Sequence, residues 1–297
     1  MIKQLREIVG KLNIYEHYSL KKCTSFGIGG NARFYATPRT VEELFNLIDF
    51  SNKNNLKFKI IGNGTNLLFS DNGFNGLVVS LRKMTSAVVV DGCNILASAG
   101  ASLDSLINLA KENFLSGLEF ATGIPGSLGG AIVMNAGAGG SELASILKTA
   151  TILEYGEIKT INAKDLKFGY RSSYFLNNSN AIILFAELNL KKVANKNEIE
   201  EKMLYNKSRR FKTQPTQRSA GCVFKKCGDS PAGQLIDQAG LKNKSCGGAR
   251  VSDIHANFIV NDGDATAEDV KQLIHEIQLS VWNKYNKRLE LEIEIID

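Results

Sequence analysis

A glycine-rich segment, Gly117–Gly140, is the stretch of this sequence whose composition points most directly to chemistry. It reads GLEFATGIPGSLGGAIVMNAGAGG. Glycine loses much backbone entropy on folding, so this density needs a reason, and one is that glycine lets another group approach the main chain closely. Main-chain N–H groups exposed in this way form nests that bind anions such as a pyrophosphate. We interpret the segment as a cradle for a phosphate-bearing cofactor, with a tightly packed structural loop as the alternative.

A second glycine loop, Gly62–Asn66, follows a predicted strand at Leu56–Ile61. Its sequence, GNGTN, fails both common nucleotide patterns. The dinucleotide pattern G-x-G-x-x-G requires glycine where Leu67 stands, and the Walker pattern requires a Gly-Lys-Ser/Thr sequence that is absent. The sequence therefore argues against a Rossmann fold and against a P-loop nucleotidase.

Two charged positions are candidates for handling an anion or a proton. Arg171 lies in a polar and aromatic loop, GYRSSYF, where it is either a surface residue or an anion clamp. Glu292 is the middle of three alternating glutamates in a predicted terminal strand, Leu289–Ile296. Such a row is usually a solvated face, but the middle carboxyl could act as an acid or stabilise charge if it faced a cleft.

The five cysteines predict free thiols rather than a disulfide framework. Most cysteines in the position of Cys222, between a glycine and an apolar strand, are inert core residues. Cys222, Cys227, Cys246 and His255 lack the short paired spacing of structural zinc sites, so we predict no metal. A serine-hydrolase G-x-S-x-G elbow is also missing.

Composition favours a small-molecule enzyme in the cytoplasm. The net charge of +6 is mild and spread along the chain, which suits an anionic substrate and gives no sign of nucleic-acid binding. The sequence contains no apolar run long enough to predict a membrane span. Charges interrupt the first twenty residues, so they do not predict a signal peptide.

The pattern of predicted elements indicates an α+β fold. Residues 1–20 are predicted to be helical and then to turn. Further helices are predicted at 41–48, 102–113, 198–211, 232–240 and 266–288, of which the last carries a cap signal at Thr266 and Asp269. Strands are predicted in GLVVSL (76–81), AVVVDG (87–92) and NILASAG (94–100), in a hairpin over 149–161, at 181–190 and at 219–224. A polar stretch at 191–197 is the best domain boundary.

Taken together, several motifs resemble one known family. They are TSFGIGG (24–30), IGNGTNLLFSDNGFNGLVV (61–79), the glycine-rich segment (117–140), GYRSSYF (169–175), SAGCVFK (219–225), GGARVSDIHANFIVN (247–261) and LELEI (289–293). In this order they resemble the UDP-N-acetylenolpyruvoylglucosamine reductases, the MurB family of peptidoglycan synthesis, over almost the whole chain. The short length is similar to the second type of this family. A different flavoprotein of the same superfamily, such as an oxidase, and a non-enzymatic nucleotide-binding module are the alternatives.

The resemblance implies an architecture and a reaction. It implies an FAD-binding unit of the p-cresol-methylhydroxylase/vanillyl-alcohol-oxidase (PCMH/VAO) type with two α+β subdomains, predicted at residues 1–80 and 81–193, and a C-terminal substrate-binding domain at 194–297. It implies noncovalent FAD, NADPH as reductant, and UDP-N-acetylglucosamine enolpyruvate as the substrate that is reduced to UDP-N-acetylmuramate. The associated biology is that of cell-wall biogenesis, cell shape and cell division. We expect a monomer.

The resemblance also implies site residues. Those matched to cofactor-binding loops are Gly62, Asn63, Gly64, Thr65, Asn66, Leu67, Pro125, Gly126, Ser127, Gly130, Asn135 and Gly137. The implied catalytic residues are Arg171, Cys222 and Glu292, and the implied substrate-binding residues are Tyr170, Arg209 and Lys212.

The chain departs from the family pattern at the proton donor. Many members read S-A-G-S where this chain has Ser219 to Cys222. A thiol with an unperturbed pKa of ~8.5 is mostly protonated at neutral pH, so cysteine is able to donate the proton, and we predict a neutral thiol. A second departure is Lys225-Lys226-Cys227, where Lys-Asn-Pro is frequent in the family, and we assign no ligand there.

Overall fold

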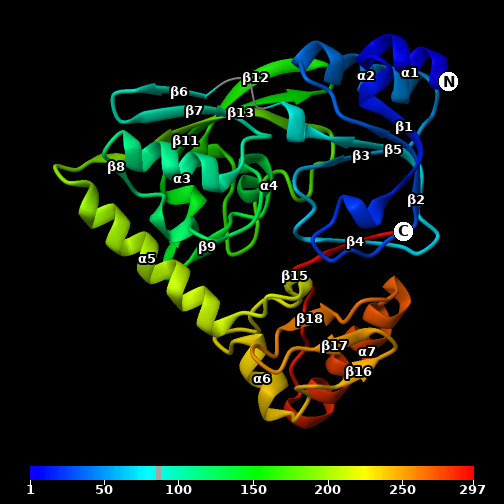
Figure 1. Ribbon diagram of the computed structural model, residues 1–297, viewed down its shortest axis with the longest axis vertical. Helices are drawn as coiled ribbons and strands as arrows, with labels where there is room; N and C mark the ends of the chain where they lie inside the picture. The colour runs from blue at the N-terminus through cyan, green and yellow to red at the C-terminus, as the bar shows by residue number, and fades with distance from the viewer. Residues whose placement is uncertain (85–87) are drawn as a thin grey trace. The chain divides into compact units, whose positions relative to one another are not determined.

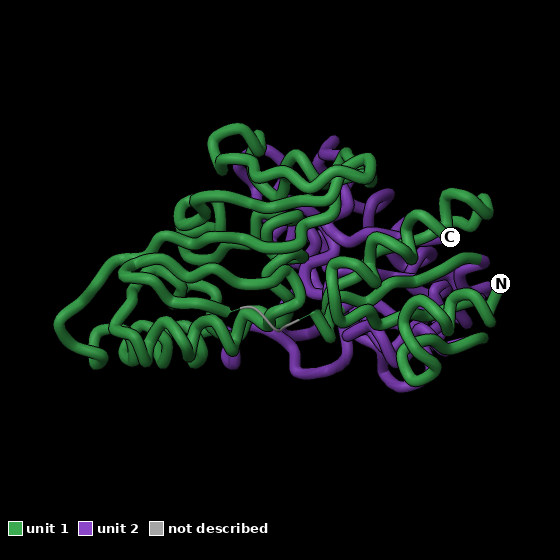
Figure 2. Tube along the Cα trace, turned by 90° about the horizontal axis from the view of Figure 1, so that it is seen from above, with its two compact units in different colours: residues 1–16, 34–63, 76–209 green, residues 17–33, 64–75, 210–297 purple. Residues whose placement is uncertain are grey.

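The computed structural model describes residues 1–84 and 88–297, so Ala87, the first residue of one predicted strand, lies outside the described residues. The chain forms two compact units that interleave along the sequence (Figure 2). Unit 1 comprises residues 1–16, 34–63 and 76–209, and unit 2 comprises residues 17–33, 64–75 and 210–297. The chain enters unit 2 for the last time at Arg210, inside a helix. The division predicted after residues 80 and 193 is a different one and stays a prediction.

A five-stranded antiparallel sheet forms the centre of unit 1, in the order β12-β11-β13-β7-β6 (Figure 1). The strands are β6 (Val88–Asp91), β7 (Asn94–Ser98), β11 (Leu147–Glu154), β12 (Glu157–Asn162) and β13 (Ala181–Asn189). The predicted hairpin over 149–161 is confirmed as β11 and β12. Helix α3 (Leu103–Glu112) matches its prediction, and α4 (Leu128–Val133) packs on β7 and β13. Their apolar sides join one core with the sheet.

A second sheet has the order β1-β2-β5-β3 and lies partly in unit 1. Its strands are β1 (Ile14–Ser19), β2 (Asn31–Ala36), β3 (Phe58–Ile61) and β5 (Phe74–Ser80), with β3 and β5 parallel. Helix α1 (Ile2–Val9) packs on α2 (Val41–Lys53). The prediction of a helix over residues 1–20 is wrong beyond Val9. Gly10 ends α1 with a φ of 77°, which favours glycine, and the chain then forms β1.

Unit 2 is built on a four-stranded antiparallel sheet in the order β15-β18-β17-β16. The strands are β15 (Arg218–Cys222), β16 (Ser245–Cys246), β17 (Ala249–Val251) and β18 (Phe258–Asn261). Helices α6 (Ala232–Gln238) and α7 (Ala267–Tyr285) bury their apolar sides in the same core as this sheet. The cap predicted for α7 is confirmed, because the Thr266 side chain accepts from the Asp269 N–H and the Asp269 side chain accepts from the Thr266 N–H.

The last segment of the chain is only partly a regular strand. The predicted strand over Leu289–Ile296 is confined to β19 (Glu294–Ile296), which pairs in parallel with β4 (Leu67–Phe69). Residues 289–293 instead contact the segment after β15 through one isolated bridge, Phe224 with Leu291. The remaining elements are α5 (Lys196–Thr213) and the short strands β8 (Leu115–Ser116), β9 (Gly137–Ala138), β10 (Ser141–Glu142) and β14 (Lys191–Lys192). Among the described helices, none has the length and apolar character to cross a membrane.

The N-terminus of α7 has a second cap from a distant loop. The Asp71 carboxylate accepts the N–H groups of Ala267 at 2.9 Å and Glu268 at 3.1 Å. These groups have no partner within the helix, and an anion near them also interacts favourably with the helix dipole.

Removing this cap should destabilise unit 2. We expect Asp71→Ala to lower the free energy of unfolding by about 1 kcal/mol, as for other helix caps. Thermal denaturation followed by circular dichroism measures the change. Asn72→Ala, at the exposed neighbouring position, is the control and should change the midpoint far less. Equal thermal midpoints for Asp71→Ala and the wild type would show that the Thr266 cap alone is enough to stabilise the N-terminus of α7.

Candidate active site

The glycine-rich segment is not one continuous loop, because it contains helix α4. Ser127 is the N-cap residue of α4, and its hydroxyl accepts the Gly130 N–H at 3.4 Å. Gly129 lies against the end of β7, where a Cβ would come within 2.9 Å of the Ala99 Cβ. Glycine at position 129 therefore serves close packing of helix on strand, which is part of the structural alternative considered from sequence. Pro125 and Gly126 precede the helix in an irregular turn, with Gly126 at a φ of 157°.

The two predicted phosphate loops meet in unit 1. A Cβ on Gly62 would lie 2.1 Å from the Ser127 hydroxyl oxygen, so no side chain fits between the loop after β3 and the loop before α4. Arg82 fixes the next residue of the first loop by donating from Nη2 to the Asn63 carbonyl at 2.7 Å. Main chain from both loops is thus brought together at one place. This is the arrangement that a backbone cradle for a pyrophosphate requires.

Two buried hydroxyls border this cradle. Ser80 is fully buried and pairs in register with Ile61, the residue before Gly62. Ser98 is 2 % exposed and directly precedes Ala99, the residue against which Gly129 packs. Neither hydroxyl has a hydrogen-bond partner among the described residues. Buried polar groups are rarely left unpaired, so these two fit a site that is completed by a polar bound group.

The remaining residues of the GNGTN loop belong to unit 2. Gly64 has a φ of 63°, and a Cβ there would lie 2.0 Å from the Cys23 carbonyl oxygen. Asn66 donates from Nδ2 to the Glu292 carbonyl at 2.9 Å, and its own carbonyl accepts the Glu294 N–H at 2.9 Å. Leu67 begins β4, and Thr65 is half-buried in the turn before it. Asn66 is therefore a neighbour of the main chain at Glu292.

Arg171 occupies a tight turn in unit 1. Gly169 and Ser172 exchange backbone hydrogen bonds of 3.0 and 3.1 Å, and Arg171 between them has a φ of 50°, which is strained for arginine. The Arg171 Nη2 donates to the Gly137 carbonyl at 3.2 Å, and its guanidinium lies 5.4 Å from the centre of the Tyr170 ring. The guanidinium is thus oriented by the glycine-rich segment and by the half-exposed Tyr170.

Buried Asn135 connects this turn to the glycine-rich segment. Its Nδ2 donates to the Gly169 carbonyl at 3.0 Å, and its Oδ1 accepts the Ala144 N–H at 3.0 Å. Ser173 makes a further connection from its hydroxyl to the Val133 carbonyl at 2.7 Å. The structure therefore brings Arg171 together with Asn135 and Gly137, two residues that were assigned to cofactor binding. That assignment of Asn135 and Gly137 stays a prediction.

Glu154, which sequence reasoning missed, anchors the far end of the same loop. Its side chain is buried at the end of β11 and accepts the Tyr174 hydroxyl at 2.5 Å and the Asn178 Nδ2 at 2.6 Å. It also forms an ion pair with Lys159 of β12. The hydrogen bonds from Lys159 and Tyr174 lower the pKa of Glu154, so the carboxyl is ionised at neutral pH. In sequence it was one residue in a hairpin strand, with no local pattern to mark it.

The two predicted substrate-binding residues on α5 lie on opposite sides of the unit boundary. Arg209 is the last residue of unit 1, and its Nη1 would be 3.6 Å from a Cβ on Gly139. Exposed Lys212 belongs to unit 2. Arg209 is therefore a neighbour of the glycine-rich segment, and the assignment of Lys212 to substrate binding stays a prediction.

Cys222 and Glu292 come from adjacent segments of unit 2. Cys222 ends β15, and Gly221 before it has a φ of 80°, which creates an irregularity in the strand. The next residue, Val223, accepts the Glu292 N–H at 2.8 Å. Both Cys222 and Glu292 are half-buried. The structure thus brings the predicted proton donor and the predicted acidic residue into one local hydrogen-bonded framework.

Cys222, Cys227, Cys246 and His255, which were considered as zinc ligands, do not form a metal-binding cluster in the described part of the chain. No group of three or more His, Cys, Asp or Glu residues placed to hold a metal ion occurs within the described part of the chain. The His255 Nδ1 accepts the Asn257 N–H at 3.2 Å, and burial lowers the pKa of His255. Desolvation raises the pKa of Cys246, which opposes the thiolate form that metals bind.

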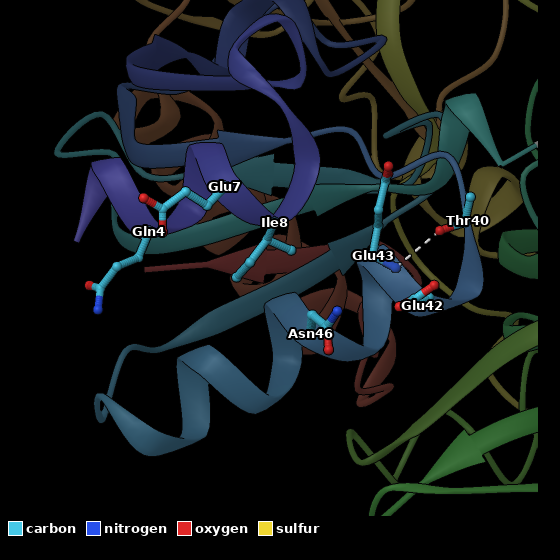
Figure 3. Close-up of a pocket in the computed structure, with 7 residues that line it drawn as sticks. All are labelled: Gln4, Glu7, Ile8, Thr40, Glu42, Glu43 and Asn46. Atoms are coloured by element: carbon cyan, nitrogen blue, oxygen red, sulfur yellow. Dashed lines mark hydrogen bonds between the residues drawn. The ribbon is translucent and has the colours of Figure 1, made fainter.

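A surface pocket in unit 1 lies apart from these motifs in sequence. Figure 3 shows its lining residues, which come from α1, from α2 and from the residue before α2: Gln4, Glu7, Ile8, Thr40, Glu42, Glu43 and Asn46. None of the predicted site residues lines it. The assignment of chemistry to the predicted site residues stays a prediction.

Comparison with known proteins identifies two family models in this chain. Residues 32–162 match an FAD binding domain, and residues 214–296 match the C-terminal domain of UDP-N-acetylenolpyruvoylglucosamine reductase. The UDP-N-acetylenolpyruvoylglucosamine reductase of Caldanaerobacter subterraneus subsp. tengcongensis is 43% identical over 298 residues, which cover 100% of this chain and 98% of the relative.

Solved structures give the same result. The crystal structure of UDP-N-acetylenolpyruvylglucosamine reductase (MurB) from Thermus caldophilus has a TM-score of 0.83 and 35% sequence identity, covering 96% of this chain and 98% of that chain. An alkyldihydroxyacetonephosphate synthase has a TM-score of 0.50 at 13% identity, covering 65% of this chain and 40% of that chain. The second likeness concerns the fold alone and agrees with the predicted FAD-binding PCMH/VAO-type α+β architecture.

The close contact between Gly62 and Ser127 predicts how a methyl group added at position 62 would affect FAD binding. We expect Gly62→Ala to weaken FAD binding at least tenfold, because its Cβ would displace the buried Ser127 and separate the two loops. Fluorescence titration with FAD measures the dissociation constant. The control is Ser127→Ala, which keeps the loops in contact. The double variant Gly62→Ala/Ser127→Ala removes the clashing hydroxyl oxygen and should recover part of the lost affinity for FAD. Wild-type affinity in Gly62→Ala would contradict the cradle.

Glu154 predicts a pH-dependent stability difference. Its pKa is lowered in the folded protein, so its stabilising effect is present above the unfolded pKa of about 4.3 and is lost as the pH falls through the folded value. We expect Glu154→Gln to lower the free energy of unfolding by about 1–3 kcal/mol at pH 7 and by less at pH 3, measured by urea denaturation. The control is Glu157→Gln, at an exposed carboxylate of the same hairpin. A difference that stayed constant with pH would show that the charge is not responsible.

Proposed function

Since this chain belongs to the UDP-N-acetylenolpyruvoylglucosamine reductase family, we propose that it reduces UDP-N-acetylglucosamine enolpyruvate to UDP-N-acetylmuramate. The observation that carries this proposal is 43% identity to a reductase of this name over the whole chain. The net reaction adds a hydride and a proton across one carbon–carbon double bond. It is a step of peptidoglycan synthesis, which links the enzyme to cell-wall biogenesis, cell shape and cell division.

The enzyme is an FAD-dependent oxidoreductase, and the residues of unit 1 fit this cofactor. The matched FAD binding domain, residues 32–162, contains Gly62, Ser127 and the two unpaired hydroxyls of Ser80 and Ser98. Bound noncovalently, FAD supplies the redox chemistry by carrying a hydride, for which we propose NADPH as the source. The chain's task is to hold the cofactor through the backbone of the loops around Gly62 and Gly126–Gly130, to place the substrate and to handle the proton.

Arg171 is proposed to stabilise negative charge on the substrate. Hydride addition to an enolpyruvyl group leaves an electron pair on the carbon beside a carboxylate, and a fixed guanidinium stabilises such charge without reorganising. The hydrogen bond from Arg171 to Gly137 and its stacking on Tyr170 support a fixed orientation. Tyr170, Arg209 and Lys212 are proposed to contact the substrate, the last two near its diphosphate.

Cys222 is proposed to give the proton, and Glu292 to hold the geometry of the intermediate or relay a proton. A thiol with an ordinary pKa of about 8.5 carries the proton needed at neutral pH. The hydrogen bond between the main chains of Glu292 and Val223 supports a shared role of the two segments. We also propose that the enzyme acts in the cytoplasm as a monomer.

A flavin spectrum recorded without oxygen tests the reaction. We expect NADPH to bleach the flavin and UDP-N-acetylglucosamine enolpyruvate to restore its colour. If only oxygen restored the colour, FAD binding would stand and the substrate assignment would be wrong.

Stopped-flow measurements of the same two steps test the proton donor. We expect Cys222→Ala to leave flavin reduction by NADPH unchanged and to slow flavin reoxidation by the substrate about 10²-fold or more, as for loss of a general acid. Cys222→Ser, which keeps a proton on a similar side chain, should retain more of that rate. Normal turnover by Cys222→Ala would remove Cys222 from the mechanism.

A further inference from the structure

The side chain of Asn257 substitutes for a strand partner beside Cys222. Its Oδ1 accepts the Phe224 N–H at 3.0 Å, and its Nδ2 donates to the Phe224 carbonyl at 2.8 Å. Its backbone carbonyl accepts the Val223 N–H at 2.8 Å. Asn257 is 6% exposed, so water does not compete freely for these bonds. One residue therefore pairs with three backbone groups in the two positions that follow Cys222.

These bonds are needed because the regular ladder ends here. β15 ends at Cys222, which pairs in register with Phe258, the first residue of β18. Buried backbone groups beyond the end of a ladder have no strand partner and need another one. The Asn257 carboxamide has one donor and one acceptor group at the spacing of a peptide, so it supplies both missing partners of Phe224.

The same short segment also carries the main chain of the predicted acid. On the side away from Asn257, Val223 accepts the Glu292 N–H at 2.8 Å, and the Lys225 N–H donates to the Glu290 carbonyl at 2.8 Å. Residues 223–225 are thus held between Asn257 and residues 290–292. Any movement of this segment would displace Cys222 and Glu292 together.

Asn257 is itself held in place by its surroundings. Its N–H donates to the His255 Nδ1 at 3.2 Å, and the His255 ring packs edge-on against Phe258 with 5.0 Å between ring centroids. Gly233 lies against that ring, since a Cβ there would be 3.0 Å from the His255 Cε1. The carboxamide therefore projects from a backbone whose position is fixed by packing.

We propose that Asn257 is a positioning residue for the proton-transfer step, holding the Cys222 segment and, through Val223, the main chain of Glu292. The inference rests on the proposed function, in which Cys222 gives the proton. Misplacement of a reacting group by about 1 Å costs up to 10²-fold in rate, so loss of this support should be measurable without removing any group that reacts.

The test compares Asn257→Ala with a matched control, Asn261→Ala. Asn261 is equally buried and is the last residue of β18, the strand that Asn257 directly precedes. Its side chain bonds Phe26, Gly263 and Ala265 rather than the Cys222 segment. We expect Asn257→Ala holoenzyme to reoxidise its flavin with the substrate at least tenfold more slowly, while reduction by NADPH stays within twofold. Asn261→Ala should lower the thermal midpoint and leave both rates within twofold of wild type.

A second readout does not depend on turnover. Alkylation of Cys222 by iodoacetamide is followed by mass spectrometry on the tryptic peptide of residues 219–225, which contains no other cysteine. We expect the alkylation rate of Cys222 to change at least threefold in Asn257→Ala and to stay at the wild-type value in Asn261→Ala. If Asn257→Ala does not fold, Asn257→Ser supplies both measurements, because it also lacks the amide donor to Phe224.

Two results would overturn the inference. One is wild-type reoxidation and alkylation in the Asn257 variant. The other is an equal fall in the flavin reoxidation rate in Asn261→Ala, which would show that any loss of stability slows the reaction. If the wild-type flavin were not reoxidised by the substrate, the proposed function would fail instead, and the alkylation rates would still decide whether Asn257 positions Cys222.

Discussion

Backbone groups near Arg171 and directly after Cys222 need hydrogen-bond partners that no strand ladder supplies. A buried backbone group left unpaired costs about 1–3 kcal/mol, so irregular segments of this kind persist only where side chains complete them. Asn135 does this for the carbonyl of Gly169, and Asn257 does it for both polar groups of Phe224. In the proposed mechanism, the reacting residues are therefore placed by polar side chains that do not themselves react.

Asparagine suits both positions for a physical reason. A carboxamide has a donor and an acceptor, whereas an ionised carboxylate has acceptors alone. Asn257 uses both groups on one residue, and Asn135 uses them to join Gly169 to Ala144. Asn135 also has a φ of 42°, a left-handed conformation that asparagine adopts more readily than most residues with a side chain. Aspartate at either position would lose the donor to a buried carbonyl.

The sequence was informative wherever the cause of a structure is local. The cap signal at Thr266 and Asp269 predicted α7, and the sequence over residues 149–161 predicted the hairpin of β11 and β12. The motifs identified the family and its FAD-binding fold, both confirmed by the family models. Local signals were misleading over residues 1–20, where the turn at Gly10 separates α1 from β1, and over residues 289–293, which lie beside another segment without forming a regular ladder.

The supporting side chains could not be found in this way because their partners are distant in the chain. Asn257 and Phe224 are 33 residues apart, Asn135 and Gly169 are 34 apart, and Glu154 and Tyr174 are 20 apart. No periodicity or cap signal relates such pairs, and each is brought together only by the tertiary fold. The helix within the glycine-rich segment was missed for a related reason, since Gly129 packs against Ala99, which directly follows β7.

In the proposed mechanism, the surroundings of Cys222 determine where the proton donor lies. Placement of the donor matters because a proton reaches carbon only from a group within hydrogen-bond reach. Gly221 has no side chain to pack beside Cys222, and its φ of 80° lies where the register of β15 with β18 shifts. Cys222 itself pairs with Phe258, and the two residues after it are held by the hydrogen bonds of Val223 and Phe224 to Asn257.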